Sequence, residues 1–275
     1  MRKLKSPGLP RMAILFVVAV AFVFPLVWIL FSSFKTDLEI GKFPPVLFPA
    51  QWKLTNYSIV WELMDFGAAF RNSLFVSTVG TAFNVLLAAL AGYALCKGNV
   101  WGARIFLPLI VGTLVVPPAS MILPNFFIIS KIGLYDSLWG LILPFAVSSF
   151  GIFFMRNYLE GVSNELIEAA RIDGAGEFRI FFAIILPVAK PAIASLSIIS
   201  FVNNWNAFTM PLVLLKSEEK FTLPLRQAYM ARATDNPSWV LILAATCLAV
   251  IPVVFIFLAL QKQFVTGVME GAVKG

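Results

Sequence analysis

Six long apolar runs divide this chain, and each is free of Asp, Glu, Lys and Arg. They cover residues 12–34, 72–96, 105–130, 137–155, 191–215 and 236–261, with lengths of 23, 25, 26, 19, 25 and 26 residues. A helix needs about 20 apolar residues to cross the hydrocarbon core of a bilayer. The pattern therefore predicts an all-α integral membrane protein, in which six transmembrane helices form one domain over residues 1–275.

The composition supports a membrane-embedded chain. Of the 275 residues, 60% are hydrophobic and 13% are charged, whereas a soluble domain carries about 25% charged residues. The net charge of +7 is scattered among the apolar runs, which favours a bilayer with anionic lipids as the partner and not a nucleic acid. Cys96 and Cys247 are far apart in the chain, so neither a disulfide framework nor a metal site is expected.

The basic residues predict the orientation of the chain. With both termini in the cytoplasm, the inner segments 1–11, 97–104, 156–190 and 262–275 carry 12 Lys and Arg, and the outer segments 35–71, 131–136 and 216–235 carry 9. The two shortest inner segments contain no acid. Short loops follow the positive-inside rule best, so we expect a multi-pass protein of the cell (plasma or inner) membrane with both termini inside.

The third run contains a break. Pro117 and Pro118 lie near its middle, and adjacent prolines interrupt the hydrogen-bond ladder of a helix. Such a break is tolerated in a membrane where protein or a wet cavity satisfies the freed carbonyl groups. A simple packing kink is the alternative interpretation.

The inner segment 156–190 has an amphipathic, helix-forming pattern. Ser163 is a suitable cap for a helix over residues 164–172, Gly174 suits the turn after it, and a second helix is expected from about Glu177 to Leu186, limited by Pro187. Helices this short are marginal alone, so the pair needs a partner surface or the ends of its own spans to stabilise it. Two short helices around a Gly turn can also seat in the groove of a partner. The alternative is a helix lying on lipid, but its charged face would then be mainly basic, and this one is of mixed sign.

The fifth run contains a polar cluster, Asn203, Asn204, Trp205 and Asn206. Amides at membrane depth face other helices or water, and amides with an indole suit the hydroxyl groups and apolar face of a sugar. We therefore regard these four residues as a candidate substrate path, with Asn84 and Asn125 as weaker candidates. Hydrogen bonding between helices is the alternative role for these amides.

The sequence argues against two ways in which this chain could power transport by itself. The spans contain no ionisable Asp, Glu, Lys, Arg or His, whereas an ion-coupled carrier or a membrane-embedded enzyme usually buries such groups. The chain also lacks the Gly-x-x-x-x-Gly-Lys-Ser/Thr sequence of an ATP-binding loop. We therefore expect no cofactor in this chain and no enzymatic activity of its own, with the energy supplied by another protein.

Three groups of residues carry a resemblance to a known family. The inner segment contains Glu168-Ala169-Ala170, Asp173-Gly174-Ala175 and Leu186-Pro187, and the fifth run contains Trp205-Asn206-Ala207-Phe208 with Pro211-Leu212. The last residues end in Ala272-Val273-Lys274-Gly275. In type and spacing these residues resemble the permease subunits of carbohydrate ABC importers, and the tail is similar to that of the smaller membrane subunit of maltose permeases.

The resemblance covers the whole chain and implies a type I ABC importer permease fold. It implies a second homologous permease subunit, two ATP-binding subunits that hold ATP and Mg²⁺, and an extracytoplasmic solute-binding protein. In that family the inner segment is a coupling loop that docks in a cleft of the ATPase. The resemblance assigns the charged contact there to Glu168 and the turn to Gly174, and it implies that Lys274 and Gly275 contact the ATPase.

The sequence is thus interpreted as a subunit that forms half of the pore of an ATP-driven importer for a carbohydrate, with a di- or oligosaccharide as the expected solute, working by alternating access. The same type of importer for another solute, such as glycerol phosphate, remains the alternative.

Overall fold

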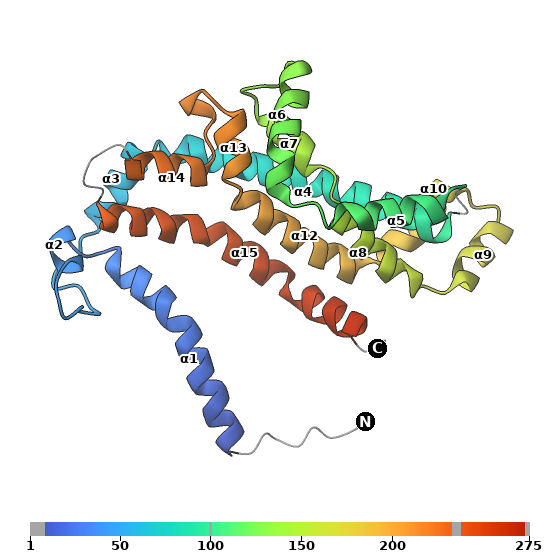
Figure 1. The fold of residues 1–275 in the computed structure, drawn as a ribbon. Coiled ribbons are helices and arrows are strands. Elements are labelled where there is room, and N and C mark those ends of the chain that lie inside the picture. The colour runs from blue at the N-terminus through green and yellow to red at the C-terminus, as the bar shows by residue number, and fades with distance from the viewer. Residues whose placement is uncertain (1–8, 99–100, 233–237, 273–275) are drawn as a thin grey trace. The chain divides into compact units, whose positions relative to one another are not determined.

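The computed structural model describes residues 9–98, 101–232 and 238–272, and each regular element in these ranges is a helix (Figure 1). The chain divides into two compact units. One consists of residues 1–66 and 227–251, and the other consists of residues 67–226 and 252–275. The absence of strands from the described ranges agrees with the predicted all-α class.

The first unit contains α1 (Leu9–Ser32), α2 (Asp37–Ile40), α3 (Thr55–Leu63) and parts of α14 (Leu223–Arg232) and α15 (Trp239–Ala272). Lys35 follows α1 and is 1% exposed. Its ammonium group donates to Ser32 Oγ at 3.2 Å and to the carbonyl oxygen of Val46 at 2.5 Å, and it lies 4.3 Å from the ring centroid of Trp28. Burial lowers the pKa of Lys35, although the charge of Glu39 opposes the shift. These contacts hold the segment after α1 against the end of that helix.

Besides the rest of α14 and α15, the second unit is built from the remaining helices. They are α4 (Phe66–Lys97), α5 (Ala103–Thr113), η1 (Pro118–Met121), α6 (Ile122–Lys131), α7 (Leu138–Phe145), α8 (Ser149–Glu160), α9 (Asn164–Ile172), α10 (Glu177–Ile180), the π-helical turn η2 (Phe181–Ile185), α11 (Leu186–Val188), α12 (Lys190–Trp205), α13 (Thr209–Leu214) and η3 (Glu218–Lys220).

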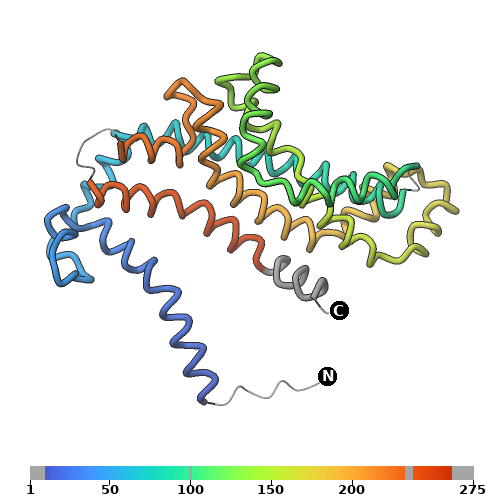
Figure 2. The backbone as a smooth tube through the Cα atoms, in the orientation of Figure 1, coloured from blue at the N-terminus to red at the C-terminus, as the bar shows by residue number. Residues whose placement is uncertain are grey.

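Three of the six apolar runs form single long helices, within α1, α4 and α15. The third run bends by 103° between α5 and η1 at the predicted proline pair, and Figure 2 shows the chain turning sharply there. The fourth run also bends, by 41° between α7 and α8. The fifth run ends its long helix at Trp205 and resumes helical structure at Thr209. The limits of each span within a bilayer stay predictions.

The last two breaks were not predicted from the apolar pattern. Ser148 accepts a hydrogen bond from the Gly151 amide at 3.2 Å and so caps a new helix, α8, inside an uninterrupted apolar run. Asn206 lies at the C-terminal cap of α12. A short polar side chain competes with the helix for backbone hydrogen bonds, and hydrophobicity alone does not register that competition.

Two buried clusters hold the second unit together. One lies among α4, α8, α9 and the η2–α12 region, and it includes Met155, Leu159, Phe181 and Leu196. The other lies among α4, α6, α7 and α13, and it includes Ile129, Leu141 and Leu214. In the first cluster α4 and α8 approach very closely, because a Cβ added at Gly92 would lie 2.8 Å from the backbone nitrogen of Arg156. Only glycine permits this spacing.

The segment around Asp136, which is predicted to lie outside, is fixed by a set of hydrogen bonds. The Asp136 carboxylate accepts from the backbone amides of Lys216 and Ser217 at 2.9 and 3.0 Å and from the Ser217 hydroxyl at 2.5 Å. It also accepts from the ammonium group of Lys220 at 3.0 Å. The start of α4 holds the facing segment 216–221, because Asn72 donates to the carbonyl oxygens of Glu219 and Phe221 at 2.8 and 3.1 Å.

Candidate functional site

The inner segment folds into two short helices around a tight turn, which we call the docking element (164–182). Its first helix, α9, has the predicted bounds Asn164–Ile172, and the Ser163 hydroxyl accepts from the Glu165 amide at 3.2 Å as a cap. The second helical stretch starts at Glu177 and continues past Leu186 and Pro187 to Val188. Pro187 is therefore not the limit of the helix, because the chain widens into the π-helical turn before it and takes the proline into the first turn of α11.

Gly174 adopts the conformation that the turn requires. Its φ angle is 79°, in the left-handed region that side chains disfavour, and its amide donates to the carbonyl oxygen of Arg171 at 3.0 Å. The Ala175 amide donates to the carbonyl oxygen of Ala170 at 2.9 Å, and the Asp173 amide donates to that of Ala169 at 3.0 Å. The bonds close the end of α9, so Asp173, Gly174 and Ala175 together build the turn.

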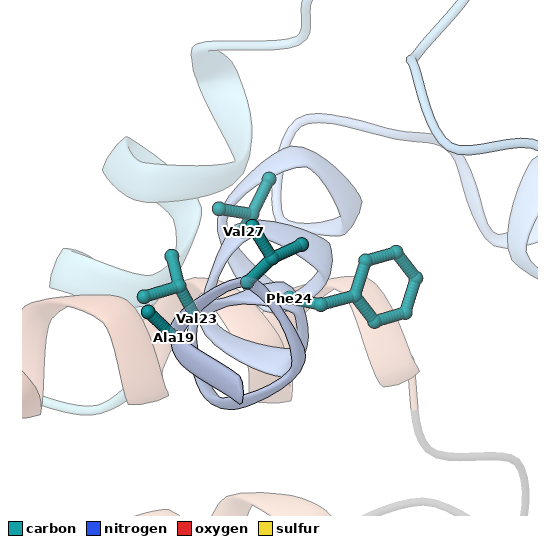
Figure 3. A pocket seen from close by; sticks show the side chains of 5 residues that line it. Ala19, Val23, Phe24 and Val27 are labelled. Atoms are coloured by element: carbon teal, nitrogen blue, oxygen red, sulfur yellow. The ribbon is translucent and has the colours of Figure 1, made fainter. Parts of the chain in front are cut away.

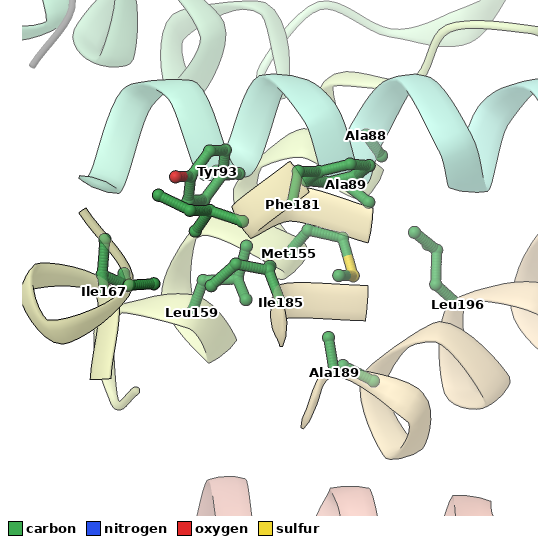
Figure 4. Packing of buried hydrophobic residues seen from close by; sticks show 13 residues of the cluster. Ala88, Ala89, Tyr93, Met155, Leu159, Ile167, Phe181, Ile185, Ala189 and Leu196 are labelled. Atoms are coloured by element: carbon green, nitrogen blue, oxygen red, sulfur yellow. The ribbon is translucent and has the colours of Figure 1, made fainter. Parts of the chain in front are cut away.

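One face of the docking element is buried in the second unit. Ile167, Ile180 and Phe181 are each no more than 2% exposed, and they pack with Tyr93 of α4 and Leu159 of α8 (Figure 4). Leu186 packs at the edge of the same cluster, whereas Pro187 is exposed. The packing of this face supplies the stability that two helices under about 12 residues lack by themselves.

A second face of the same segment is apolar but uncovered. The exposed fractions are 44% for Leu166, 87% for Ile172, 78% for Phe178 and 53% for Phe182. Phe178 and Phe181 are equally apolar, but the structure leaves Phe178 exposed and buries Phe181 together with Ala170. The hydrophobic pattern could not make this division, because it depends on where α4 and α8 lie.

Glu168 and Ala169 lie on the exposed side of α9. Glu168 forms no hydrogen bond or ion pair with any residue of the described ranges. It lines a polar hollow of about 200 Å³ together with Cys96, Lys97, Asn164, Ile167 and Arg171. An exposed acid beside a hollow is available to a basic group of another protein.

Polar contacts attach the docking element to the end of α4. The Lys97 ammonium group donates to the carbonyl oxygen of Val162 at 2.8 Å and to Asn164 Oδ1 at 2.6 Å. Glu177 accepts from the Tyr93 hydroxyl at 2.6 Å and from Arg171 Nε at 2.9 Å. The hydrogen bond from Tyr93 is the main cause that lowers the pKa of Glu177; burial opposes it and Arg171 adds to it.

The four residues of the predicted substrate path have different surroundings. Asn203 and Asn206 are exposed, whereas Trp205 is 2% exposed and lies between the rings of Phe201, with centroids 5.6 Å apart, and Phe70, with centroids 5.8 Å apart. Trp205 therefore packs between two aromatic rings in this structure, and its assignment to the substrate path stays a prediction.

Two of the other amides form hydrogen bonds between helices. Asn204 donates to Thr81 Oγ1 at 3.4 Å, and Asn84 donates to Ser200 Oγ at 2.7 Å; both contacts join α4 to α12. Asn125 is half-buried on α6. The alternative role, hydrogen bonding between helices, therefore fits Asn84 and Asn204, and Asn125, Asn203 and Asn206 stay candidates for a path.

Some predicted residues cannot be assessed, and some residues were missed. Lys274 and Gly275 lie outside the described residues. Tyr93 and Lys97 were not singled out, since a tyrosine and a lysine at the end of a span read as ordinary interface residues. No group of three or more His, Cys, Asp and Glu residues suited to a metal ion occurs within 9–98, 101–232 and 238–272.

The first unit carries an apolar surface of a different kind. Ala19, Val20, Val23, Phe24 and Val27 line a shallow pocket of about 340 Å³ on α1, and Figure 3 labels four of them projecting from the helix. None of the most apolar stretch of α1 is buried. Such a surface requires lipid or another protein to cover it.

Comparison with known proteins decides the family. Residues 84–269 match the family of the binding-protein-dependent transport system inner membrane component. The chain belongs to this family. It is 33% identical over 280 residues to the arabinooligosaccharides transport system permease protein AraQ of Halalkalibacterium halodurans, with 100% of both chains covered. It is 32% identical to the lactose transport system permease protein LacG of Rhizobium radiobacter, with 98% of this chain and 97% of that protein covered.

The fold agrees with this membership. A chain of the crystal structure of a bacterial ABC transporter involved in the import of the acidic polysaccharide alginate superposes with a TM-score of 0.80 and 27% identity, over 94% of this chain and 96% of that chain. This binding-protein-dependent permease is therefore a subunit of an ABC importer in the inner membrane, with ATPase and solute-binding partners. It is a transport protein and not an enzyme, and ATP hydrolysis belongs to separate ATPase subunits.

Proposed function

We propose that this permease subunit forms half of the translocation pore of an importer for a carbohydrate, with a di- or oligosaccharide as the solute. The proposal is supported by the names of similar proteins, which mention arabinooligosaccharides, lactose and alginate. A second, homologous permease subunit completes the pore. Two ATP-binding subunits hold ATP and Mg²⁺ on the inside, and an extracytoplasmic binding protein delivers the solute.

The observation that carries the proposal is the two-sided docking element. Its buried side, with Ile167, Ile180 and Phe181, belongs to the core of the second unit, so the helices are rigidly mounted. Its other side exposes Ile172 and Phe178. Covering a side chain of that size contributes about 1.5–3 kcal/mol, so the surface is suited to a groove in the ATPase. Glu168, beside the polar hollow, supplies the charged contact, and Ala169 leaves room for close approach.

Movement of the ATPase subunits during ATP-driven closure would then shift the docking element as a body. Because that element shares a core with α4 and α8, its shift is transmitted to the helices that line the pore. Asn203 and Asn206 are the amides of this chain that we assign to the substrate path. A pair of amides without an ionisable partner suits a neutral solute with hydroxyl groups.

The experiment compares ATPase retention and uptake for four forms of the permease complex: the natural chain, Ile172→Ser, Glu168→Ala and a control variant. Truncating a buried charge contact costs about 2–5 kcal/mol, so Glu168→Ala should release most of the ATPase subunit and abolish uptake. Ile172→Ser should weaken retention while leaving the permease folded, because Ile172 is 87% exposed. Leu38→Ser, at an equally exposed position on α2 (84% exposed), is the matched control. It should change neither ATPase retention nor uptake.

Full ATPase retention and full uptake in both variants would show that the docking element is not the coupling surface. The solute is tested separately, with the complete complex and its binding protein in proteoliposomes. Uptake of a disaccharide or oligosaccharide is the expected result. Uptake of glycerol phosphate, with no uptake of any sugar, would replace the carbohydrate by the alternative solute and leave the docking proposal intact.

A further inference from the structure

The last turn of α4 is attached to the docking element at three points. The Lys97 ammonium group holds Asn164 at the start of α9, with a distance of 2.6 Å to Oδ1. The carbonyl oxygen of Lys97 accepts from Arg171 Nη2 at 3.2 Å, near the end of α9. The Tyr93 hydroxyl, about one turn earlier on α4, donates to Glu177 at the start of α10 at 2.6 Å. Both helices of the docking element are therefore tied to one turn of one helix.

Glu177 is the centre of these contacts. Its Oε2 atom accepts from Tyr93 and its Oε1 atom accepts from Arg171, at 2.6 and 2.9 Å. The ion pair between Arg171 and Glu177 spans the Gly174 turn, so it fixes α9 relative to α10. The hydrogen bond from Tyr93 fixes both to α4. One carboxylate thus joins three helices, and each of its oxygens has a charged or hydroxyl donor.

The same helix reaches the candidate substrate path. Farther back along α4, Asn84 donates to Ser200 and Thr81 accepts from Asn204, both on α12. The exposed Asn203 and Asn206 lie at the end of α12 and just beyond it. A displacement of α4 is therefore transmitted to the residues around the proposed path.

We propose that Tyr93, Glu177 and Arg171 form a relay that fastens the docking element to α4, so that α4 follows the docking element during transport. The inference rests on the proposed docking function. The three are positioning residues: they act between the docking element and α4, and not in the contact with the ATPase. Glu168, Ile172 and Phe178 are assigned to that contact. The relay therefore governs how well ATP hydrolysis is converted into transport, and not whether the ATPase binds.

The test uses the complete importer in proteoliposomes with Tyr93→Phe, Glu177→Gln and the double variant. Tyr93→Phe removes one hydroxyl and keeps the ring that packs against Phe181, with centroids 5.7 Å apart. We expect ATPase retention and ATP hydrolysis to stay close to normal, while solute moved per ATP falls by about tenfold, the size of one lost charge-assisted hydrogen bond. The double variant should be no worse than Glu177→Gln, because losing the carboxylate charge already weakens both of its contacts, including the one that Tyr93→Phe removes.

Tyr135→Phe is the matched control, since it also removes a tyrosine hydroxyl but lies in the segment 131–136 that is predicted to be outside. It should leave the ratio of transport to hydrolysis unchanged. A normal ratio in Tyr93→Phe, or losses that add in the double variant, would overturn the relay. Loss of ATPase retention in Glu177→Gln would also overturn it, by making Glu177 a docking contact. Failure of the docking function itself is distinguishable, because Glu168→Ala would then retain the ATPase and transport normally.

Discussion

Asn84 on α4 donates its side-chain amide to the hydroxyl of Ser200 on α12, with 2.7 Å between Nδ2 and Oγ. Asn84 is 4% exposed and Ser200 is 5% exposed, so the bond lies inside the second unit. A hydrogen bond between helices in a membrane protein contributes about 0.6–2 kcal/mol. The contact makes Asn84 a stabilising residue between two helices.

The first prediction follows from this contact. Asn84→Ala should lower the free energy of unfolding by about 1–2 kcal/mol, because Ser200 loses its donor and a small cavity opens. Thermal unfolding of the purified complex in detergent measures the effect. Asn203→Ala removes an exposed amide and should leave stability unchanged while raising the substrate concentration needed for half-maximal uptake. If Asn203→Ala lowered stability and Asn84→Ala changed only the substrate concentration, the roles given to Asn84 and Asn203 would be reversed.

The second prediction concerns the close approach of α4 and α8. Gly92→Ala should destabilise the protein by about 1–3 kcal/mol, because its Cβ would lie 2.8 Å from the Arg156 backbone nitrogen and the helices must separate. Gly112→Ala on α5 is the matched control. A Cβ there meets nothing within 4 Å, and alanine is the better helix former, so stability should stay level or rise slightly. Equal unfolding temperatures for the two variants would contradict the close approach.

The third prediction separates two glycines of the docking turn. Neither Gly174 nor Gly176 has an atom within 4 Å of an added Cβ, so space does not distinguish them. The backbone conformation distinguishes the two glycines, because φ is 79° at Gly174 and −73° at Gly176. Gly174→Val should therefore strain the turn by about 1–3 kcal/mol and abolish uptake without preventing membrane insertion. Gly176→Ala should transport normally.

The measurement is ATP-dependent uptake together with the amount of permease in the membrane. If Gly174→Val transports at the natural rate, the turn does not need its left-handed conformation. If both variants fail equally, crowding or loss of chain flexibility would replace backbone strain as the cause.

The fourth prediction concerns acid. Burial opposes the charge of Asp136, but hydrogen bonds from the Ser217 hydroxyl, the backbone amides of Ser217 and Lys216, and Lys220 outweigh it and hold the pKa of Asp136 well below its ordinary value. A lowered pKa in the folded state means that the stabilisation is complete above the unfolded value of about 3.9 and is lost as the pH falls below it. Asp136→Asn should therefore be less stable than the natural chain at neutral pH.

The difference in unfolding temperature should shrink as the pH falls below about 4. Asp65→Asn is the control, because Asp65 also has a positive φ, 44° against 55° for Asp136, but lacks that set of donors. A difference that is the same at every pH, or that appears equally in Asp65→Asn, would show that the charge of Asp136 is not what fixes Lys216 and Ser217.

The sequence by itself determined the class of the protein. A helix satisfies its own backbone hydrogen-bonding groups inside a bilayer, and an uncharged run of about 20 residues is long enough to cross it. The lengths of the runs were therefore sufficient to predict an all-α membrane protein. Local chemistry was sufficient for α9, because Ser163 and Gly174 supply the cap and the turn from within a few residues. The break at Pro117 and Pro118 was predictable for the same reason, since proline removes a donor wherever it stands.

Only the tertiary structure decided which side chains are exposed and which have partners within the protein. Phe178 and Phe181 are equally apolar and three residues apart, yet one is 78% exposed and the other 1%, because α4 and α8 cover one side of the segment. Asn203 and Asn204 are adjacent amides, and the position of Thr81 assigns Asn204 to a helix contact. The relay through Tyr93 and Glu177 joins residues 84 positions apart. Burial and partner choice depend on contacts that are distant in the sequence, so no local pattern specifies them.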